Sequence, residues 1–139
     1  MRCLALDIGD QRTGAAVGEV LARPVATLKR RSKVQDFAVI ANLIREHQAD
    51  TLVVGLPLNM DGSQGFQAQR VVRYAEKLKA ALDEMGLKVN LVLWDERLST
   101  QQAEEMLIKS GRGERSRRRR VDAVAAAVIL QSYLTSLEN

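Results

Sequence analysis

The sequence predicts an α/β fold that opens with an antiparallel meander of three strands and continues with alternating helices and strands. Three short apolar runs, at 4–8, 15–20 and 25–28, are separated by brief polar segments, as in consecutive antiparallel strands. Two later apolar runs, at 51–55 and 89–94, follow segments whose apolar residues recur at helical spacing. The length of 139 residues fits a single domain over 1–139.

Composition narrows the class of protein. A hydrophobic fraction of 46% with only 4% aromatic residues is typical of a small aliphatic α/β domain. The net charge of +4 favours an acidic partner. Cys3, the single cysteine, cannot form an internal disulfide and is expected to be a buried apolar residue. No run is long enough to span a membrane and no leader pattern opens the chain, so we expect a cytoplasmic protein with no membrane partner.

The first strand ends on a carboxylate and a glycine. Its residues are apolar on both faces, so Asp7 is expected to be poorly solvated and to need a cation, hydrogen-bond donors or a proton. Gly9 would let a phosphate or a second backbone approach closely. From this stretch alone, a metal ligand and an acceptor of backbone N–H groups are equally good interpretations of Asp7.

The next elements follow from turn and cap signals. Residues 10–14 are predicted to form a hairpin turn, and Pro24 predicts an edge position or a strand start for the third strand. Ser32 with Gln35 forms a capping-box pattern at the start of a helix that ends near His47. The basic residues before and in its first turn are interpreted as solvated; they are Lys29, Arg30, Arg31 and Lys33.

The middle of the chain predicts a central strand, a loop and a long helix. The β-branched run at 51–55 leads into a polar loop at 56–63, where open α/β sheets bind ligands. A helix over about 65–85 then ends before Gly86. Its cations are most simply a solvated face; they are Arg70, Arg73, Lys77 and Lys79.

The last third of the chain carries two further acids of interest. Alternation along 89–96 places Asp95 and Glu96 on opposite faces. A helix over about 99–110 is followed by an arginine-rich loop at 112–120, predicted to be mobile and to order on a polyanion, with a loop that only aids solubility as the alternative. In the final helix, from Val121 onward, Asp122 shares the stripe of the core residues and also lies where the helix dipole favours a carboxylate.

Asp7, Glu96 and Asp122 thus lie at element ends, and such hard oxygen ligands suit Mg²⁺ or Mn²⁺. Two such ions can support in-line phosphodiester hydrolysis. The chain has no Cys/His set for zinc, and its single histidine offers no Ser/His/Asp arrangement.

Four motifs together resemble the YqgF family, also called RuvX, whose members are described as nucleases of the 16S rRNA precursor and formerly as Holliday junction resolvases. They are Leu6-Asp7-Ile8-Gly9 with Arg12 and Gly14, the segment 53–63, the segment 95–100, and the helix 121–131. The resemblance covers essentially the whole chain. It implies an RNase H-like fold with a five-stranded mixed sheet flanked by helices, and a bacterial cytoplasmic protein associated with processing the 5′ end of 16S rRNA.

The resemblance also implies roles for individual residues. Asp7, Glu96 and Asp122 would be the catalytic acids and the ligands of Mg²⁺ or Mn²⁺, with a metal-activated water as nucleophile. Nucleic acid would be held by polar and basic side chains, namely Arg12, Asn59, Arg97, Arg112, Arg115, Arg117, Arg118, Arg119 and Arg120. Thr13 replaces a usual aliphatic residue, and Ala125 stands where junction resolvases of this fold carry a further acid, which favours RNA over branched DNA.

The leading interpretation is therefore a metal-dependent endonuclease acting on structured RNA, as a monomer or weak homodimer. A DNA junction resolvase is an alternative that requires two symmetric sites and hence a dimer. A non-catalytic RNA-binding ribosome-assembly factor is another. A half of an actin-like ATPase is a fourth, but 139 residues are too few for the two domains such ATPases need.

Overall fold

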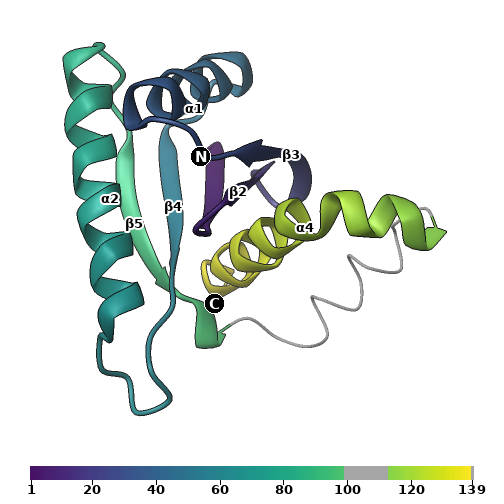
Figure 1. Cartoon of the computed structure of the whole chain (residues 1–139). Helices are drawn as coiled ribbons and strands as arrows, with labels where there is room; N and C mark the ends of the chain where they lie inside the picture. Colours follow the sequence, from purple (N-terminus) through teal and green to yellow (C-terminus); the bar gives the residue numbers. More distant parts are fainter. Residues whose placement is uncertain (99–112, 139) are drawn as a thin grey trace.

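A computed structural model of the chain describes residues 1–98 and 113–138, with the backbone alone for 113–120 (Figure 1). Its elements, in chain order, are β1 (Cys3–Ile8), β2 (Arg12–Gly18), β3 (Arg23–Lys29), α1 (Lys33–His47), β4 (Thr51–Leu56), α2 (Phe66–Glu84), β5 (Asn90–Asp95), a 3₁₀ turn η1 (Glu96–Leu98) and α4 (Gly113–Ser136). Within those described residues, no helix is long and apolar enough to cross a membrane.

The five strands form one mixed sheet in the order β3-β2-β1-β4-β5. The β1, β2 and β3 strands pair antiparallel, while β4 pairs parallel with both β1 and β5. The predicted meander and mixed sheet are thus confirmed. Since β3 is an edge strand and Pro24 is its second residue, the edge position predicted from that proline is confirmed as well.

Helices cover both faces of the sheet (Figure 1). Leu4, Leu6 and Ile8 of β1 point into a core shared with α1 and α2. Cys3 and Ala5 point into a second core shared with α4. Cys3 is 2% exposed, as expected of an apolar filler, and burial raises the pKa of its thiol to about 11.

The start of α1 is fixed by the predicted capping box. The Ser32 hydroxyl accepts a hydrogen bond from the Gln35 backbone N–H at 3.2 Å, and the Gln35 side chain accepts one from the Ser32 backbone at 3.4 Å. These bonds satisfy two donors that a helix start leaves unpaired. The hydrophobic face of α1 then packs Phe37, Ile40 and Ile44 against the sheet.

Two predicted boundaries are wrong. The turn between the first strands was expected to extend to Gly14, but β2 begins at Arg12, so Thr13 and Gly14 pair with Ile8 and Asp7 of β1. The ladder continues here because the turn closes early, through a hydrogen bond from the Gly9 N–H to the Arg12 carbonyl oxygen at 2.9 Å.

The arginine-rich segment is the second correction. Residues 113–120, predicted to be a mobile loop, form the first two turns of α4. Arginine is among the better helix formers and no proline interrupts the run, so the helix continues beyond its apolar part. The predicted helix at 99–110 and Arg112 lie outside the described residues.

Candidate active site

The three predicted acids lie at one edge of the sheet, on the face covered by α4. Asp7 lies on β1 between the residues that face α1 and α2, and so points to the α4 side. Glu96 directly follows β5, whose Val92 and Trp94 pack in the α4-side core. Because β1, β4 and β5 are parallel, the carboxyl ends of these strands meet at the same edge.

Gly55 on β4 provides the space through which Glu96 reaches Asp7. A Cβ atom at Gly55 would lie 2.7 Å from Glu96 Oε1 and 2.6 Å from the Cδ1 atom of Ile129. With hydrogen in that position, the Glu96 side chain lies over the strand and forms a hydrogen bond with Asp7. A small residue at the middle strand therefore brings together carboxyl groups from two strands that do not neighbour each other.

The Asp7–Glu96 contact requires one of the two groups to carry a proton. Burial, the charge of Asp7 and the hydrogen bond to Asp7 raise the pKa of Glu96 to about 7. Burial and then the charge of Asp122 raise the pKa of Asp7, while the hydrogen bond with Glu96 opposes that rise. Glu96 is thus the donor and Asp7 the acceptor, a pattern in which two acids share a site.

Asp122 approaches the pair from α4. Gly14 is paired with Asp7 across the β1–β2 ladder, and the backbone of Asp122 lies against Gly14. The Asp122 carboxylate accepts a hydrogen bond from Arg12 Nε at 2.9 Å and is 28% exposed. Arg12 therefore contacts a predicted acid of the site, and its own side chain remains 58% exposed.

These side chains fit a divalent cation in chemistry, although they are not arranged around one. Among the described residues, no three Asp, Glu, His or Cys side chains are placed to hold a metal ion as they stand, and Asp122 is engaged by Arg12 instead. However, Asp7 and Glu96 are half-buried carboxyl groups, and loss of solvation together with a nearby acid raises both pKa values, Asp122 being that acid for Asp7 and Asp7 for Glu96. A positive charge between them would replace the shared proton, and an all-oxygen donor set suits Mg²⁺ or Mn²⁺.

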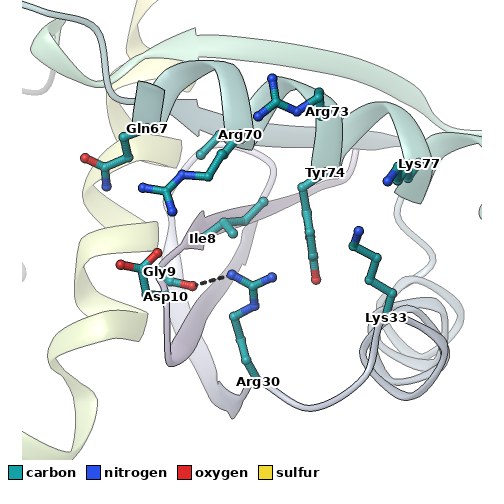
Figure 2. A pocket seen from close by; sticks show the side chains of 11 residues that line it. Ile8, Gly9, Asp10, Arg30, Lys33, Gln67, Arg70, Arg73, Tyr74 and Lys77 are labelled. Atoms are coloured by element: carbon teal, nitrogen blue, oxygen red, sulfur yellow. Dashed lines mark hydrogen bonds between the residues drawn. The ribbon is translucent and has the colours of Figure 1, made fainter. Parts of the chain in front are cut away.

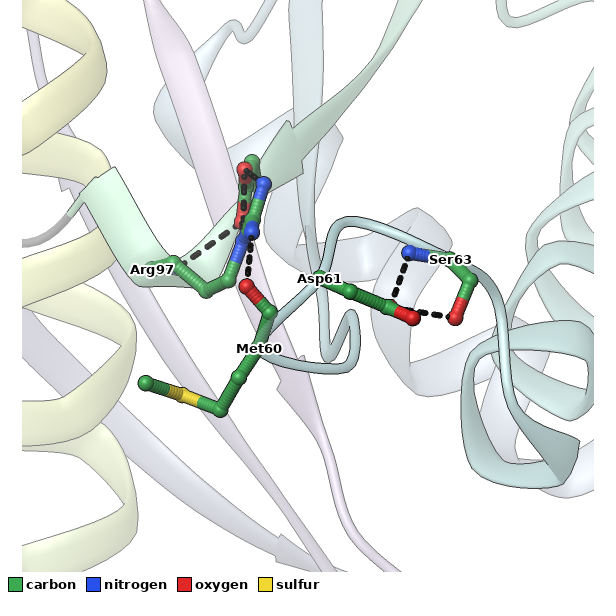
Figure 3. Close-up of polar contacts among 5 residues, drawn as sticks. Met60, Asp61, Ser63 and Arg97 are labelled. Carbon is green, nitrogen blue, oxygen red and sulfur yellow. Dashed lines mark hydrogen bonds and ion pairs between the residues drawn. The ribbon is translucent and has the colours of Figure 1, made fainter.

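Asp95 plays a different part from Glu96, as alternation predicted. Its carboxylate accepts hydrogen bonds from Arg97, at 2.8 Å from Nη2 and 3.1 Å from Nε, and this contact lowers the pKa of Asp95. Arg97 Nη1 also donates to the carbonyl oxygen of Met60 at 3.0 Å (Figure 3). Through these hydrogen bonds, Arg97 links the loop after β4 to the end of β5.

That loop is also held by its own polar residues. Asp61 accepts hydrogen bonds from the N–H and hydroxyl of Ser63, at 2.9 and 2.6 Å (Figure 3). Asn59 donates to the Ser63 hydroxyl at 3.0 Å. Asn59 and Arg97, both predicted to hold nucleic acid, are therefore engaged in shaping the loop, and contact with nucleic acid remains a prediction for them.

The remaining predicted nucleic-acid ligands lie on α4 or beyond the described residues. Arg115 and Arg117–Arg120 lie in the helical segment 113–120, and Arg112 is outside the description. The roles of Gly14 and Gly55 were missed in the sequence, although both belong to the quoted motifs. A glycine inside a strand signals close approach of another chain segment, and that signal marks both positions.

Comparisons with known proteins identify the family of the chain. A family model described as "RuvX: Holliday junction resolvase" matches residues 1–136. A protein of Caldanaerobacter subterraneus subsp. tengcongensis named "Putative pre-16S rRNA nuclease" is 41% identical, covering 100% of this chain and 99% of that protein. A protein of the same name from Syntrophus aciditrophicus is 44% identical, covering 99% of this chain and 90% of its own length.

Solved structures support the fold. The structure titled "T. thermophilus RuvC in complex with Holliday junction substrate" matches with a TM-score of 0.63 at 16% identity, covering 98% of this chain and 96% of that chain. The Fowlpox virus resolvase in complex with Holliday junction DNA matches with a TM-score of 0.61 at 14% identity over 100% of both chains. The fold is therefore RNase H-like, and the match over residues 1–136 together with the curated relatives shows that the chain belongs to the RuvX family.

Proposed function

We propose that this protein is a metal-dependent endonuclease that hydrolyses phosphodiester bonds in structured RNA, with the 16S rRNA precursor as substrate. The observation that carries the proposal is the half-buried Asp7–Glu96 pair, which meets over Gly55 and in which both carboxyl groups have raised pKa values. The names of the relatives support RNA as the substrate class.

Three acids would hold the ion or ions, Mg²⁺ or Mn²⁺. Asp7 interacts with Glu96 through a hydrogen bond and with the charge of Asp122, so it would be the shared ligand. When bound, a divalent ion supplies positive charge to the scissile phosphate and to the attacking water. Ion binding requires Glu96 to give up the proton that it shares with Asp7, so the affinity for the ion is expected to rise as pH increases through about 7.

Arg12 has a positioning role in this proposal. It donates to the Asp122 carboxylate at 2.9 Å and remains largely exposed beside the site. If Asp122 served as a ligand of an ion, the Arg12 guanidinium would be free to bind the phosphate backbone of the substrate. The arginines of the segment 112–120 would add further backbone contacts, which carry no sequence information but strengthen binding at low salt.

The test is cleavage of a labelled 16S precursor fragment in Mg²⁺ or Mn²⁺ by the wild type and by Asp7→Asn. We expect cutting by the wild type only, with a loss of about 100-fold or more in Asp7→Asn and little change in RNA binding. Asp83→Asn is the matched control, because Asp83 only pairs with Lys79 on the surface of α2. Equal cutting by Asp7→Asn would refute the assigned site.

Two further experiments distinguish the proposed function from its alternatives. A four-way DNA junction tests the resolvase function, and sedimentation of the protein with that junction tests for the dimer that paired cuts require. Cutting of the junction in preference to the RNA would overturn the substrate assignment. RNA binding with no cutting in either metal would favour the assembly-factor function.

A further inference from the structure

A second polar site lies on the opposite face of β1 from the acids. A cavity of about 270 Å³ opens between the turn after β1, the start of α1 and one side of α2 (Figure 2). Five of its lining residues are cations, namely Arg30, Lys33, Arg70, Arg73 and Lys77. Asp10 is the one carboxylate among its lining residues. The cavity therefore carries a strong excess of positive charge.

These cations are not neutralised within the protein. Among the described residues, none of the five forms an ion pair within 4.0 Å of a carboxylate; the ion pairs there involve Arg2, Arg12, Lys79 and Arg97. Instead, Lys33 and Lys77 lie beside each other, and the close approach of the Lys77 ammonium lowers the pKa of Lys33. Like charges placed together in this way are stabilised when an anion binds between them.

Arg30 is held in place at the base of the cavity. Its Nη1 atom donates to the carbonyl oxygen of Gly9 at 2.9 Å, and its guanidinium lies 4.9 Å from the centre of the Tyr74 ring. The Tyr74 ring is fixed in turn by an edge-to-face contact with Phe37 at 5.3 Å between centroids. These contacts pre-order the guanidinium and use only part of its donor set, so an oxyanion can bind without a large loss of side-chain entropy.

Tyr74 supplies a second, independent observation at this cavity. The residue is 5% exposed, and its hydroxyl has no hydrogen-bond partner among the described residues. Figure 2 shows this hydroxyl directed toward the space between Arg30 and Lys33, two of the cations that line the cavity. Burial raises the pKa of Tyr74 to about 12, so the group is a donor at neutral pH. A buried donor without an acceptor is costly, and an anion in the cavity would satisfy it.

We propose that this cavity binds a backbone phosphate of the nucleic-acid strand whose neighbouring segment enters the acid site. The proposal rests on the proposed function, because it assigns the cavity to the same substrate strand. Gly9 and Asp10 line the cavity two and three residues after Asp7. A nucleic-acid strand that crosses the β1–β2 turn would thus place one phosphate near the acids and another among the cations. The protein would then hold this nucleic-acid strand on both sides of the sheet.

Binding of a labelled RNA in EDTA, measured by anisotropy over a range of salt, tests this site without cleavage. The double variant Arg70→Gln/Lys77→Gln removes two exposed cations of the cavity. Arg45→Gln/Lys88→Gln removes the same charge from exposed positions that do not line it. We expect the first to weaken binding about tenfold and to reduce the salt slope by about 1, and the second to change affinity less than about twofold.

Two further measurements complete the test. The charge-retaining variant Arg70→Lys/Lys77→Arg should restore most of the affinity, since the site reads charge and hydrogen-bond donors. Equal loss of RNA affinity in the two charge-removing variants would overturn the proposal, because the loss would then follow from the change in net charge alone. A titration with inorganic phosphate, followed by NMR at the backbone amides of Gly9 and Asp10, tests whether the cavity binds a free phosphate ion instead of a phosphate of the nucleic-acid strand. Tight phosphate binding with unchanged RNA affinity in the cavity variant would overturn the strand assignment.

The outcome separates this proposal from the proposed function. Loss of RNA binding in the cavity variant supports the phosphate site even if the wild type cuts nothing. Normal cutting by the wild type, together with cavity and control variants that bind alike, supports the nuclease and rejects the site.

Discussion

Gly14 and Asp122 are in such close contact that a Cβ atom on Gly14 would lie 1.7 Å from the Asp122 carbonyl oxygen. The two residues are 108 positions apart, and Gly14 is also paired with Asp7 on the neighbouring strand. The contact therefore fixes the distance between the helix that carries one acid and the strand that carries another. The atoms that the added Cβ would meet all belong to the backbone of Asp122 and Ala123, so no rotation of a side chain can relieve the clash.

Gly14→Ala is expected to displace α4 from the sheet. Overpacking a core typically costs about 1–3 kcal/mol, and here the backbone itself must shift, so the loss should lie at the upper end. Metal-dependent cleavage should fall in parallel, because Asp122 moves away from Asp7. Urea unfolding and the cleavage assay measure the two effects.

Gly86→Ala is the control for that substitution. Gly86 has φ of 78° and nothing within 4 Å of its added Cβ, so only the backbone strain of about 1 kcal/mol is expected and activity should be retained. If Gly14→Ala were no less stable and no less active than Gly86→Ala, the close contact would not position α4.

Gly55→Ala is expected to separate activity from stability. The added methyl group would meet the Glu96 carboxylate and the end of the Ile129 side chain, and both are side-chain atoms that can move. The loss of stability should therefore stay near 1 kcal/mol. Glu96 would nevertheless be pushed away from Asp7, so cleavage should fall by tenfold or more. Full activity in Gly55→Ala would show that Glu96 does not need to lie over this strand.

The Asp7–Glu96 pair predicts how stability depends on pH in the metal-free protein. The pKa of Glu96, about 7, lies above its ordinary value of 4.5, so the folded state binds a proton that the unfolded chain releases. This contribution is complete below about 4.5 and is lost as pH rises through 7. The wild type should therefore lose stability between pH 5 and pH 8.

The Glu96→Gln variant should not show this loss of stability between pH 5 and pH 8. Its unfolding free energy in EDTA should exceed that of the wild type by about 1–2 kcal/mol at pH 8 and show little gain at pH 5, because the amide neither ionises nor repels Asp7. Glu46→Gln, at an exposed position of α1, is the control and should leave the pH profile unchanged. A wild-type profile that is flat from pH 5 to pH 8 would contradict the shared proton.

Local signals in the sequence were sufficient for most of the fold. Alternation and short polar breaks located the five strands, and Ser32 with Gln35 located the start of α1. The start of α4 was missed because consecutive arginines combine good helix propensity with mutual repulsion, and their spacing does not reveal which effect dominates. The acids at the strand ends were identifiable, whereas the pairing of Arg12 with Asp122, 110 positions apart, was not.

The cation-lined cavity illustrates the same limit. Arg30 and Lys33 lie some 40 residues before Arg70 and Lys77, and each pair on its own is typical of a solvated surface. The sequence accordingly predicted two exposed basic faces. Only the packing of α1 beside α2 through Phe37 and Tyr74 turns those faces toward one cavity.

Thr13 lies on β2 with its side chain in the protein interior, and its hydroxyl predicts a gain in stability from substitution. The side chain is 2% exposed, and the hydroxyl oxygen has no hydrogen-bond partner among the described residues. Thr13→Val keeps the shape, removes a buried unpaired polar group and should raise the unfolding free energy by about 1 kcal/mol. Thr13→Ser keeps the hydroxyl, loses a methyl group and should lower stability by about 1 kcal/mol. Urea unfolding of both variants and the wild type ranks their free energies of unfolding. A Thr13→Val protein less stable than the wild type would mean that the hydroxyl forms a hydrogen bond that stabilises the fold by more than its burial costs.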